Sequence, residues 1–335
     1  MFIKTGISGL DFLLGGGIFF DKTLSETGIF PTLEIKGPPG SGKTTMALQI
    51  ITSILRQKNK NDGFAFATEQ PIQYYTKSYY DLHSIDDSKD VNIIPTLYSP
   101  DFKKTENKCN LFLINPDFTN FDSFNTEIYE IINNYTSKNK QNYVPVILID
   151  SLSSIDDEYT QCQFLQLKNY CSRHAELTIF INDDTTENEF NFISYYCDIV
   201  FSLKYDCSSV EYENKFEYNE RTLEILKARH QYHYRGKHNF SINGSDTSVF
   251  SNDKIHGINI FPSMAARLSV QSKKHHQVND NYRYSIGIAD LDDSINGKCD
   301  GKSLSVGSSN LLIGERGTSK KILGSYFLFN STLLI

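Results

Sequence analysis

Short apolar runs alternate with amphipathic, helix-like stretches between about residue 30 and residue 205. Uninterrupted apolar runs of this length are typical of strands buried on both faces of a parallel sheet. The alternation therefore predicts an α/β fold with a mostly parallel central sheet flanked by helices. The expected strands are Leu33–Lys36, Phe64–Thr68, Leu111–Asn115, Val146–Ile149, Thr178–Ile181 and Ile199–Leu203.

The composition of the chain changes after residue 205. From there up to Phe261 and Pro262, segments rich in Tyr, Glu and Arg have strand-like character. A polar stretch from Ser272 to Asp280 follows, and it has little apolar surface to bury. A chain of 335 residues also favours about two domains. We therefore expect a first domain at 1–271, a linker at 272–281 and the start of a second domain at 282–335.

The segment GPPGSGKT matches the phosphate-binding motif G-x-x-x-x-G-K-[ST] in full, between an apolar strand and an amphipathic helix expected from Thr45 to about Leu55. The motif binds phosphates because its glycines let backbone N–H groups surround the β-phosphate. Lys43 would neutralise the β- and γ-oxygens, and the Thr44 hydroxyl would bind Mg²⁺. The expected nucleotide-binding residues are Gly37, Pro38, Pro39, Gly40, Ser41, Gly42, Lys43, Thr44 and Thr45.

A sequence repeat indicates that the second domain duplicates the first. Gly6–Asp11 (GISGLD) returns as Gly287–Asp292 (GIADLD), and each copy precedes a strand-turn-helix pattern. The second loop, Gly314–Lys321, has Ser319 in place of Gly42 and Lys321 in place of Thr44. It lacks the Mg²⁺-binding hydroxyl, so we expect no hydrolysis there. About 55 residues cannot complete an α/β domain, so this second domain is expected to be incomplete.

Two further apolar runs end in carboxylates. Val146–Ile149 delivers Asp150 to the carboxyl edge of the sheet beside Thr44, where it would hold Mg²⁺. The alternative is that Asp150 merely caps the following helix. The strand directly after the phosphate-loop helix ends in Glu69, which could orient and deprotonate a water that attacks the γ-phosphate.

A row of cations follows in the Tyr-rich region. Lys227, Arg229, His233 and Arg235 are separated by even numbers of residues, so in an extended strand all four would project from one face. This basic face could bind an anion, or it could be a solvated edge strand protected by charge. His230 and His233 would point to opposite faces, which disfavours a metal site between them.

Composition narrows the class of protein. Apolar residues make up 39% of the chain, which is enough for a hydrophobic core. The net charge of −7 argues against non-specific binding to nucleic acid. The six cysteines form no C-x-x-C pair, which is typical of reduced thiols in a cytoplasmic protein. No secretory leader and no apolar run of 18 residues is present, so we expect no membrane association.

The motifs together resemble the KaiC-like branch of the RecA-type ATPases, from about residue 5 to 268 and again from near residue 286. The phosphate loop marks only the superfamily, whereas the segments from Leu223 onward are more specific to this branch. The resemblance is carried by GISGLDFLLGGG from Gly6, GPPGSGKTT from Gly37, ATEQP from Ala67, ILIDSLSSI from Ile147, LEILKARH from Leu223, YRGKHNFSI from Tyr234 and GINIFP from Gly257.

The resemblance implies tandem RecA-like domains, hexameric rings and ATP with Mg²⁺ held between neighbouring protomers. Lys227 and Arg229 match residues that reach the γ-phosphate of the adjacent protomer's ATP, and Glu69 matches the first of a catalytic acidic pair. The second member of that pair is Gln70 here, so one carboxylate remains. The degenerate second loop argues against protein kinase activity and a circadian role.

Three functions remain open from the sequence. The first is a regulatory ring ATPase in which Glu69 activates water. The second is a nucleotide-gated scaffold with negligible hydrolysis, read by an unknown protein partner, which Gln70 and the second loop favour. The third is a DNA-dependent, recombinase-like ATPase, which the acidic net charge disfavours.

Overall fold

The computed structural model describes fifteen stretches of the chain, and the chain divides into two compact units, Met1–Ala266 and Arg267–Ile335. The described residues are 2–20, 29–58, 62–82, 91–96, 109–138, 144–155, 160–183, 192–212, 214–243, 257–271, 279–286, 288–296, 304–306, 322–324 and 327.

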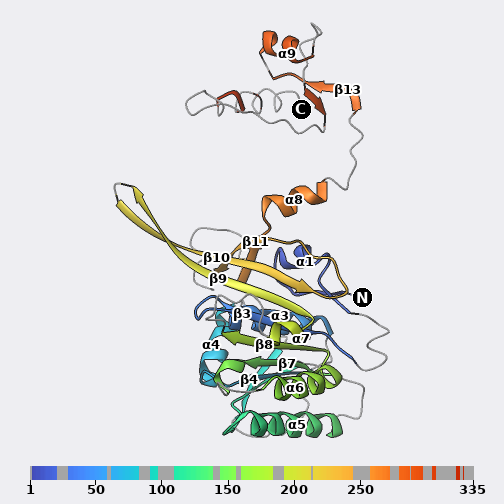
Figure 1. Cartoon of the computed structure of the whole chain (residues 1–335), viewed down its shortest axis with the longest axis vertical. Helices are drawn as coiled ribbons and strands as arrows, with labels where there is room; N and C mark the ends of the chain where they lie inside the picture. Colours follow the sequence, from blue (N-terminus) through green and yellow to red (C-terminus); the bar gives the residue numbers. More distant parts are fainter. Residues whose placement is uncertain are drawn as a thin grey trace. The chain divides into compact units, whose positions relative to one another are not determined.

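The first unit is built around a ten-stranded sheet with the order β12-β11-β10-β9-β3-β8-β7-β4-β6-β5 among the described residues (Figure 1). The strands from β9 to β5 in this order are parallel, whereas β10, β11 and β12 add an antiparallel extension. The predicted α/β fold is therefore confirmed. The strands are β3 (Thr32–Gly37), β4 (Gly63–Ala67), β5 (Val91–Thr96), β6 (Cys109–Ile114), β7 (Val146–Asp150), β8 (Leu177–Asp183), β9 (Ile199–Tyr212), β10 (Asn214–Ala228), β11 (Lys237–Asn243) and β12 (Gly257–Phe261).

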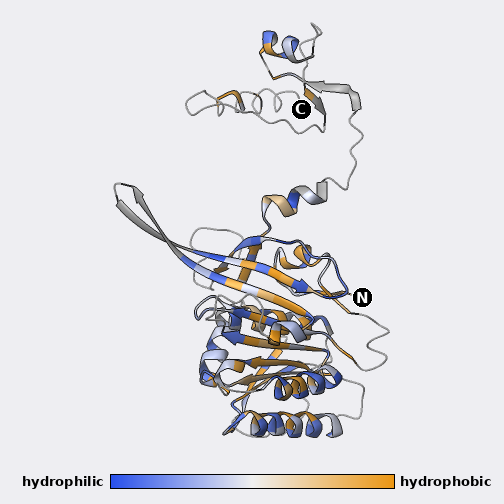
Figure 2. Cartoon of the chain, in the orientation of Figure 1, coloured by the Kyte–Doolittle hydropathy of each residue, from blue (hydrophilic) through white to orange (hydrophobic). Residues whose placement is uncertain are grey.

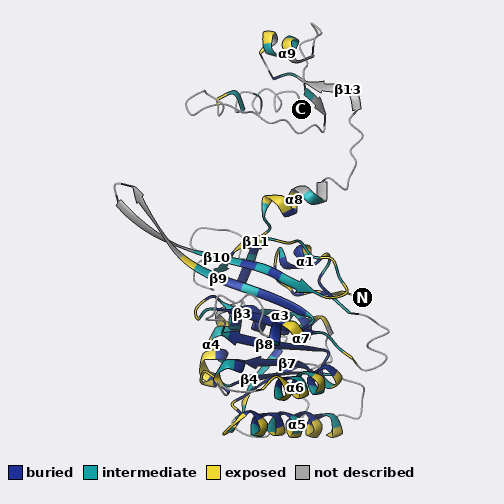
Figure 3. Ribbon diagram, viewed as in Figure 1, coloured by how far each residue is buried: buried dark blue, intermediate teal, exposed yellow. Residues whose placement is uncertain are grey.

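Helices cover both faces of the sheet and give the unit two hydrophobic cores (Figures 1 and 3). Alternate residues of β4 belong to different cores, since Ala65 packs with α3 and α4 whereas Phe64 packs with α5 and α6. Strand β7 is buried along its whole length and β8 is buried up to Asn182, as their apolar runs predict (Figure 3). Most residues of these two strands are hydrophobic (Figure 2). The helices are α3 (Lys43–Lys58), α4 (Ile72–Leu82), α5 (Phe121–Lys138), α6 (Gln161–His174) and the short α7 (Phe192–Tyr196).

Smaller elements complete the two units. A two-stranded sheet, β1 (Phe2–Ile3) with β2 (Ile18–Phe19), lies in the N-terminal segment. A second two-stranded sheet, β13 with β14, belongs to the second unit. The remaining elements are α1 (Leu10–Leu13), the 3-10 helix η2 (Leu152–Ser154), α8 (Met264–Gln271), β13 (Asn279–Tyr284), α9 (Ala289–Asn296) and β14 (Leu304–Val306).

The two copies of the sequence repeat form the same local structure. Asp11 Oδ1 accepts a hydrogen bond of 2.8 Å from the backbone N–H of Thr5. Asp292 Oδ1 accepts a bond of the same length from the backbone N–H of Ile286. A short helix begins beside each aspartate, which supports the inferred duplication. The degenerate loop Gly314–Lys321 and most of the predicted linker, residues 272–278, lie outside the described residues.

Within the part of the chain that the structure describes, no helix is long and apolar enough to cross a membrane.

A buried histidine in the antiparallel extension makes stability depend on pH. The backbone N–H of Ser263 donates to His238 Nδ1 over 3.1 Å, so the ring is neutral with its proton on Nε2, near Tyr234 O. Burial lowers the pKa of His238 below its usual 6.5. Since the unfolded chain then binds this proton more tightly, we expect the free energy of unfolding to fall as pH drops below about 6.5. Denaturant unfolding of the wild type and of His238→Asn from pH 8 to pH 5 tests this. The free energy of unfolding should fall less steeply with decreasing pH in the variant, because the variant lacks the titrating ring.

Candidate nucleotide-binding site

The phosphate loop joins the carboxyl end of β3 to the first residue of α3, as the motif predicts. Gly40 and Gly42 adopt φ values of 78° and 98°, a left-handed conformation that side chains disfavour. The loop therefore needs glycine at these two positions. Ser41 Oγ is buried and makes no hydrogen bond within the described residues, so a polar acceptor on a bound ligand would satisfy it.

Thr44 and Asp150 meet at the edge of the sheet. Thr44 Oγ1 donates to Asp150 Oδ2 over 2.7 Å, although the two residues are far apart in sequence. Burial raises the pKa of Asp150 to about 6, and the nearby charges of Glu69 and Asp183 also raise it, while the Thr44 hydrogen bond lowers it. A hydroxyl and a carboxylate suit Mg²⁺, which usually takes one or two protein ligands and completes its shell with phosphate oxygens and water.

No group of three or more His, Cys, Asp or Glu residues that could enclose a metal ion occurs among the described positions. The donor set at Thr44 and Asp150 therefore fits a cation that arrives with a phosphate ligand better than it fits a permanently bound metal.

Glu69 follows β4 at the same edge, and its side chain is exposed. The preceding residue fixes the backbone there, since Thr68 N–H donates to Asp150 O over 2.8 Å and Thr68 Oγ1 donates to Ser151 O over 2.7 Å. The Glu69 carboxylate is close enough to Asp150 to influence its charge. This backbone anchor positions Glu69 beside the Thr44–Asp150 pair while leaving its carboxylate accessible to water.

Asp183 also lies at this edge, although it was not among the residues expected from the sequence. It is the last residue of β8 and pairs in register with Gly37. Its carboxylate forms an ion pair of 2.7 Å with Lys43 Nζ, and it accepts a hydrogen bond of 3.0 Å from Ser153 Oγ. Lys43 also donates to Gly37 O and Pro38 O. The lysine that should bind phosphates is therefore engaged by a neighbouring carboxylate.

We expect Asp183→Asn to tighten nucleotide binding roughly tenfold, because phosphates then displace a neutral amide instead of a charged partner of Lys43. Titration with a fluorescent nucleotide checks this. Asp290→Asn, which removes the same charge from α9, is the control and should leave the affinity unchanged. Equal affinities for the wild type and Asp183→Asn would mean that the ion pair does not compete with phosphate.

Lys227 and Arg229 lie away from the phosphate loop of their own chain. Lys227 pairs with Val200 of β9, which pairs with Glu34 of β3, so Lys227 is level with a residue three positions before Gly37. At about 3.3 Å per residue, Lys227 lies about 10 Å from the level of Gly37, measured along β3 towards its amino end. Arg229 lies further in the same direction. Lys227 Nζ donates to Ser194 O and Tyr195 O over 3.0 and 2.7 Å.

The predicted four-residue basic row is wrong. Strand β10 ends at Ala228, and Arg229 and His230 form a turn in which His230 has a φ of 61°. His233 and Arg235 follow in irregular structure and so do not continue the strand face of Lys227. In addition, a β-bulge lies between Ile225 and Lys227 and changes the alternation of side chains. As a result, the consecutive residues Leu226 and Lys227 both contact the face of the sheet that α5–α7 cover.

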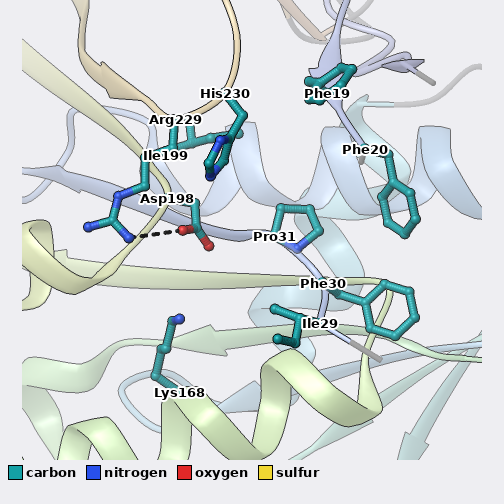
Figure 4. Close-up of a pocket in the computed structure, with 10 residues that line it drawn as sticks. All are labelled: Phe19, Phe20, Ile29, Phe30, Pro31, Lys168, Asp198, Ile199, Arg229 and His230. Carbon is teal, nitrogen blue, oxygen red and sulfur yellow. Dashed lines mark hydrogen bonds and ion pairs between the residues drawn. The ribbon is translucent and has the colours of Figure 1, made fainter. Parts of the chain in front are cut away.

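A small pocket adjoins Arg229 (Figure 4). Arg229 Nη1 lies 3.4 Å from Asp198 Oδ1, while Phe20, Ile29 and Phe30 supply apolar lining. The cavity is about 80 Å³, well below the size of ordinary ligand pockets. The arginine is thus held at the surface of the sheet edge and is not enclosed in a nucleotide-sized cavity of this protomer.

Comparison with known families identifies the family to which this chain belongs. The family profile described as the KaiC ATPase matches residues 3–254, which is most of the chain. The chain belongs to the KaiC ATPase family. The resemblance inferred from the motifs is therefore confirmed, and the RecA-like identity of the fold with it.

Curated relatives agree with this KaiC assignment. The circadian clock oscillator protein KaiC of a Picosynechococcus strain is 26% identical over 340 residues, which cover 97% of this chain and 55% of that protein. KaiC of Rippkaea orientalis is likewise 26% identical over 338 residues, covering 97% of this chain and 54% of that protein. The chain spans about half the length of the curated relatives it matches.

A solved structure supports the fold. The crystal structure of a KaiC-like protein from Pyrococcus horikoshii aligns with a TM-score of 0.53 and 20% sequence identity. The alignment covers 78% of this chain and 99% of that chain. At this identity the likeness establishes the shared RecA-type architecture.

Proposed function

We propose that this KaiC-family chain is an Mg²⁺-dependent ATPase whose nucleotide lies between protomers of a ring, and that it acts as a regulatory or signalling ATPase. One observation carries the proposal. The phosphate loop, Asp150 and Glu69 lie at the carboxyl edge of the sheet, whereas Lys227 lies about 10 Å further back, bonded to α7. The two sets are therefore separated within one protomer, and in this proposal an adjacent protomer brings Lys227 and Arg229 to the nucleotide.

Each residue then has a distinct role in hydrolysis. The backbone from Gly37 to Gly42 and the Lys43 ammonium bind the β- and γ-phosphates, and Thr44 and Asp150 orient the metal ion. Mg²⁺, when bound, neutralises charge on the phosphate oxygens. Glu69 accepts a proton from the attacking water, and ADP leaves as the bond to the γ-phosphorus breaks. Lys227 and Arg229 of the neighbouring protomer stabilise the charge that develops on the γ-phosphate.

The experiment is Mg²⁺-ATP turnover per protomer measured as a function of protein concentration, with assembly followed by light scattering. A between-protomer site predicts a steep rise of turnover with concentration that coincides with assembly. Turnover per protomer that is independent of concentration would contradict a trans contribution from Lys227 and Arg229.

A nucleotide-gated scaffold is the second candidate. Gln70 favours it, because Glu69 is then the one carboxylate after β4 that could accept a proton from the attacking water. It predicts ATP-dependent assembly with negligible turnover at every concentration. Assembly that is unaffected by Lys43→Ala would exclude it.

A further inference from the structure

Strand β3 carries a buried carboxylate that phosphate binding does not require. Glu34 is in the middle of this central strand and is 0% exposed. Burying a carboxylate costs a large desolvation free energy unless hydrogen bonds and charges compensate for it. Leu33 and Ile35 on either side belong to the hydrophobic core, as expected for such a strand.

The bonds of Glu34 join two elements that border the two halves of the proposed site. Ser194 Oγ of α7 donates to Glu34 Oε2 over 2.6 Å. Asn182 Nδ2 of β8 lies 3.3 Å from Glu34 Oε1, and Asn182 immediately precedes Asp183, the ion-pair partner of Lys43. Glu34 therefore connects the nucleotide edge of the sheet to α7.

Helix α7 in turn holds Lys227. Glu34, Val200 and Lys227 occupy one cross-strand row of β3, β9 and β10, so their side chains leave the sheet on the same face. Lys227 Nζ donates to Ser194 O. The same serine thus binds the carboxylate through its hydroxyl and the ammonium through its carbonyl oxygen.

The charges around Lys227 favour this arrangement. Burial lowers the pKa of the Lys227 ammonium, and the nearby Arg229 lowers it further, whereas the carboxylates of Asp198 and Glu34 raise it. The Cys197 thiol also faces Lys227, but burial raises its pKa well above the usual range, so it is neutral at pH 7. Glu34 therefore helps to keep the lysine charged.

We propose that Glu34 is a positioning residue for Lys227, fixing α7 through Ser194 and holding the ammonium at the edge that faces the neighbouring protomer. The inference rests on the proposed function, since Lys227 acts there on the nucleotide of another protomer. It adds that the same carboxylate contacts β8 beside Asp183, so the position of Lys227 is tied to the phosphate loop of its own chain.

The kinetic test is Glu34→Gln, which keeps the shape of the side chain and removes its charge. We expect kcat for ATP to fall about tenfold with KM unchanged. Because Glu34 acts through Lys227, the same substitution in a Lys227→Met background should lower kcat no further. An equal loss in both backgrounds would overturn the proposal. Ser194→Ala removes only the hydroxyl and serves as the second variant if Glu34→Gln does not fold, with the same expected result.

A second readout needs no hydrolysis. NMR titration of ¹³C-labelled lysine in the full chain without nucleotide should show a lower pKa for Lys227 in Glu34→Gln than in the wild type. An unchanged Lys227 pKa would overturn the proposal. A wild type that bound ATP without turnover would instead contradict the ATPase function, and the titration would still decide whether Glu34 positions Lys227.

Discussion

Replacing Lys227 by Met should lower ATP turnover about 10³-fold or more, the effect typical of a cation supplied in trans to a transferring phosphate. Nucleotide affinity of the altered protomer should change little, since Lys227 is bonded to Ser194 O and Tyr195 O and not to the phosphate loop of its own chain. Steady-state turnover and nucleotide titration on the same preparation separate the two effects. Lys138→Met, on the exposed end of α5, is the control.

Mixing variants gives a sharper test of the same arrangement. Lys43→Ala damages the phosphate loop, and Lys227→Met removes the cation that a neighbouring protomer would supply, so each variant alone should turn over ATP at least about 10³-fold more slowly than the wild type. In a one-to-one random mixture about a quarter of the head-to-tail interfaces combine two intact halves, and a corresponding fraction of wild-type turnover should return. No recovery in assemblies that demonstrably contain both variants would rule out a shared site.

Glu69→Gln should lower turnover by about 10²- to 10⁴-fold, because the amide cannot accept a proton from the attacking water. Binding of ATP should persist, since the residues that bind phosphate and metal are untouched. A quenched-flow measurement of the first turnover tests the chemical step directly, without contributions from product release.

The neighbouring residue supplies the matched control for Glu69. Gln70→Ala should leave turnover close to that of the wild type, whereas Gln70→Glu restores a second carboxylate and should raise it. Hydrolysis that survives Glu69→Gln but not Gln70→Ala would show that the base had been assigned to the wrong residue.

Much of the fold could be predicted from the sequence because the central strands are buried on both faces. Apolar runs such as Val146–Ile149 leave no other interpretation once helical patterns flank them. Strand β5 (Val91–Thr96) is at an edge, mixes polar residues and contains Pro95, so its pattern is weak. The extent of β9 and β10 was also missed, because their polar, Tyr-rich sequence carries no apolar periodicity.

The site was predictable where a motif or a strand end specifies position. Asp150 could be assigned beside Thr44 because it ends a buried parallel strand, and the structure brings the two together. The same rule would have found Asp183 after the apolar run of β8. Lys227 was harder, since the bulge before it breaks the period of two on which the predicted basic row depended.

The separation of Lys227 from the phosphate loop, about 10 Å along the sheet by strand register, also limits the symmetry of any assembly in which protomers share a nucleotide. In a two-fold dimer a surface meets its own copy, so the phosphate-loop edge would meet another phosphate-loop edge and its nucleotide would lack the cations of Lys227 and Arg229. Head-to-tail contact is heterologous, and it gives either a closed ring or an open filament. A filament leaves a phosphate loop without a neighbour at one end, and Lys227 and Arg229 without a neighbouring nucleotide at the other. Ring closure is then what gives every nucleotide a complete set of contacts.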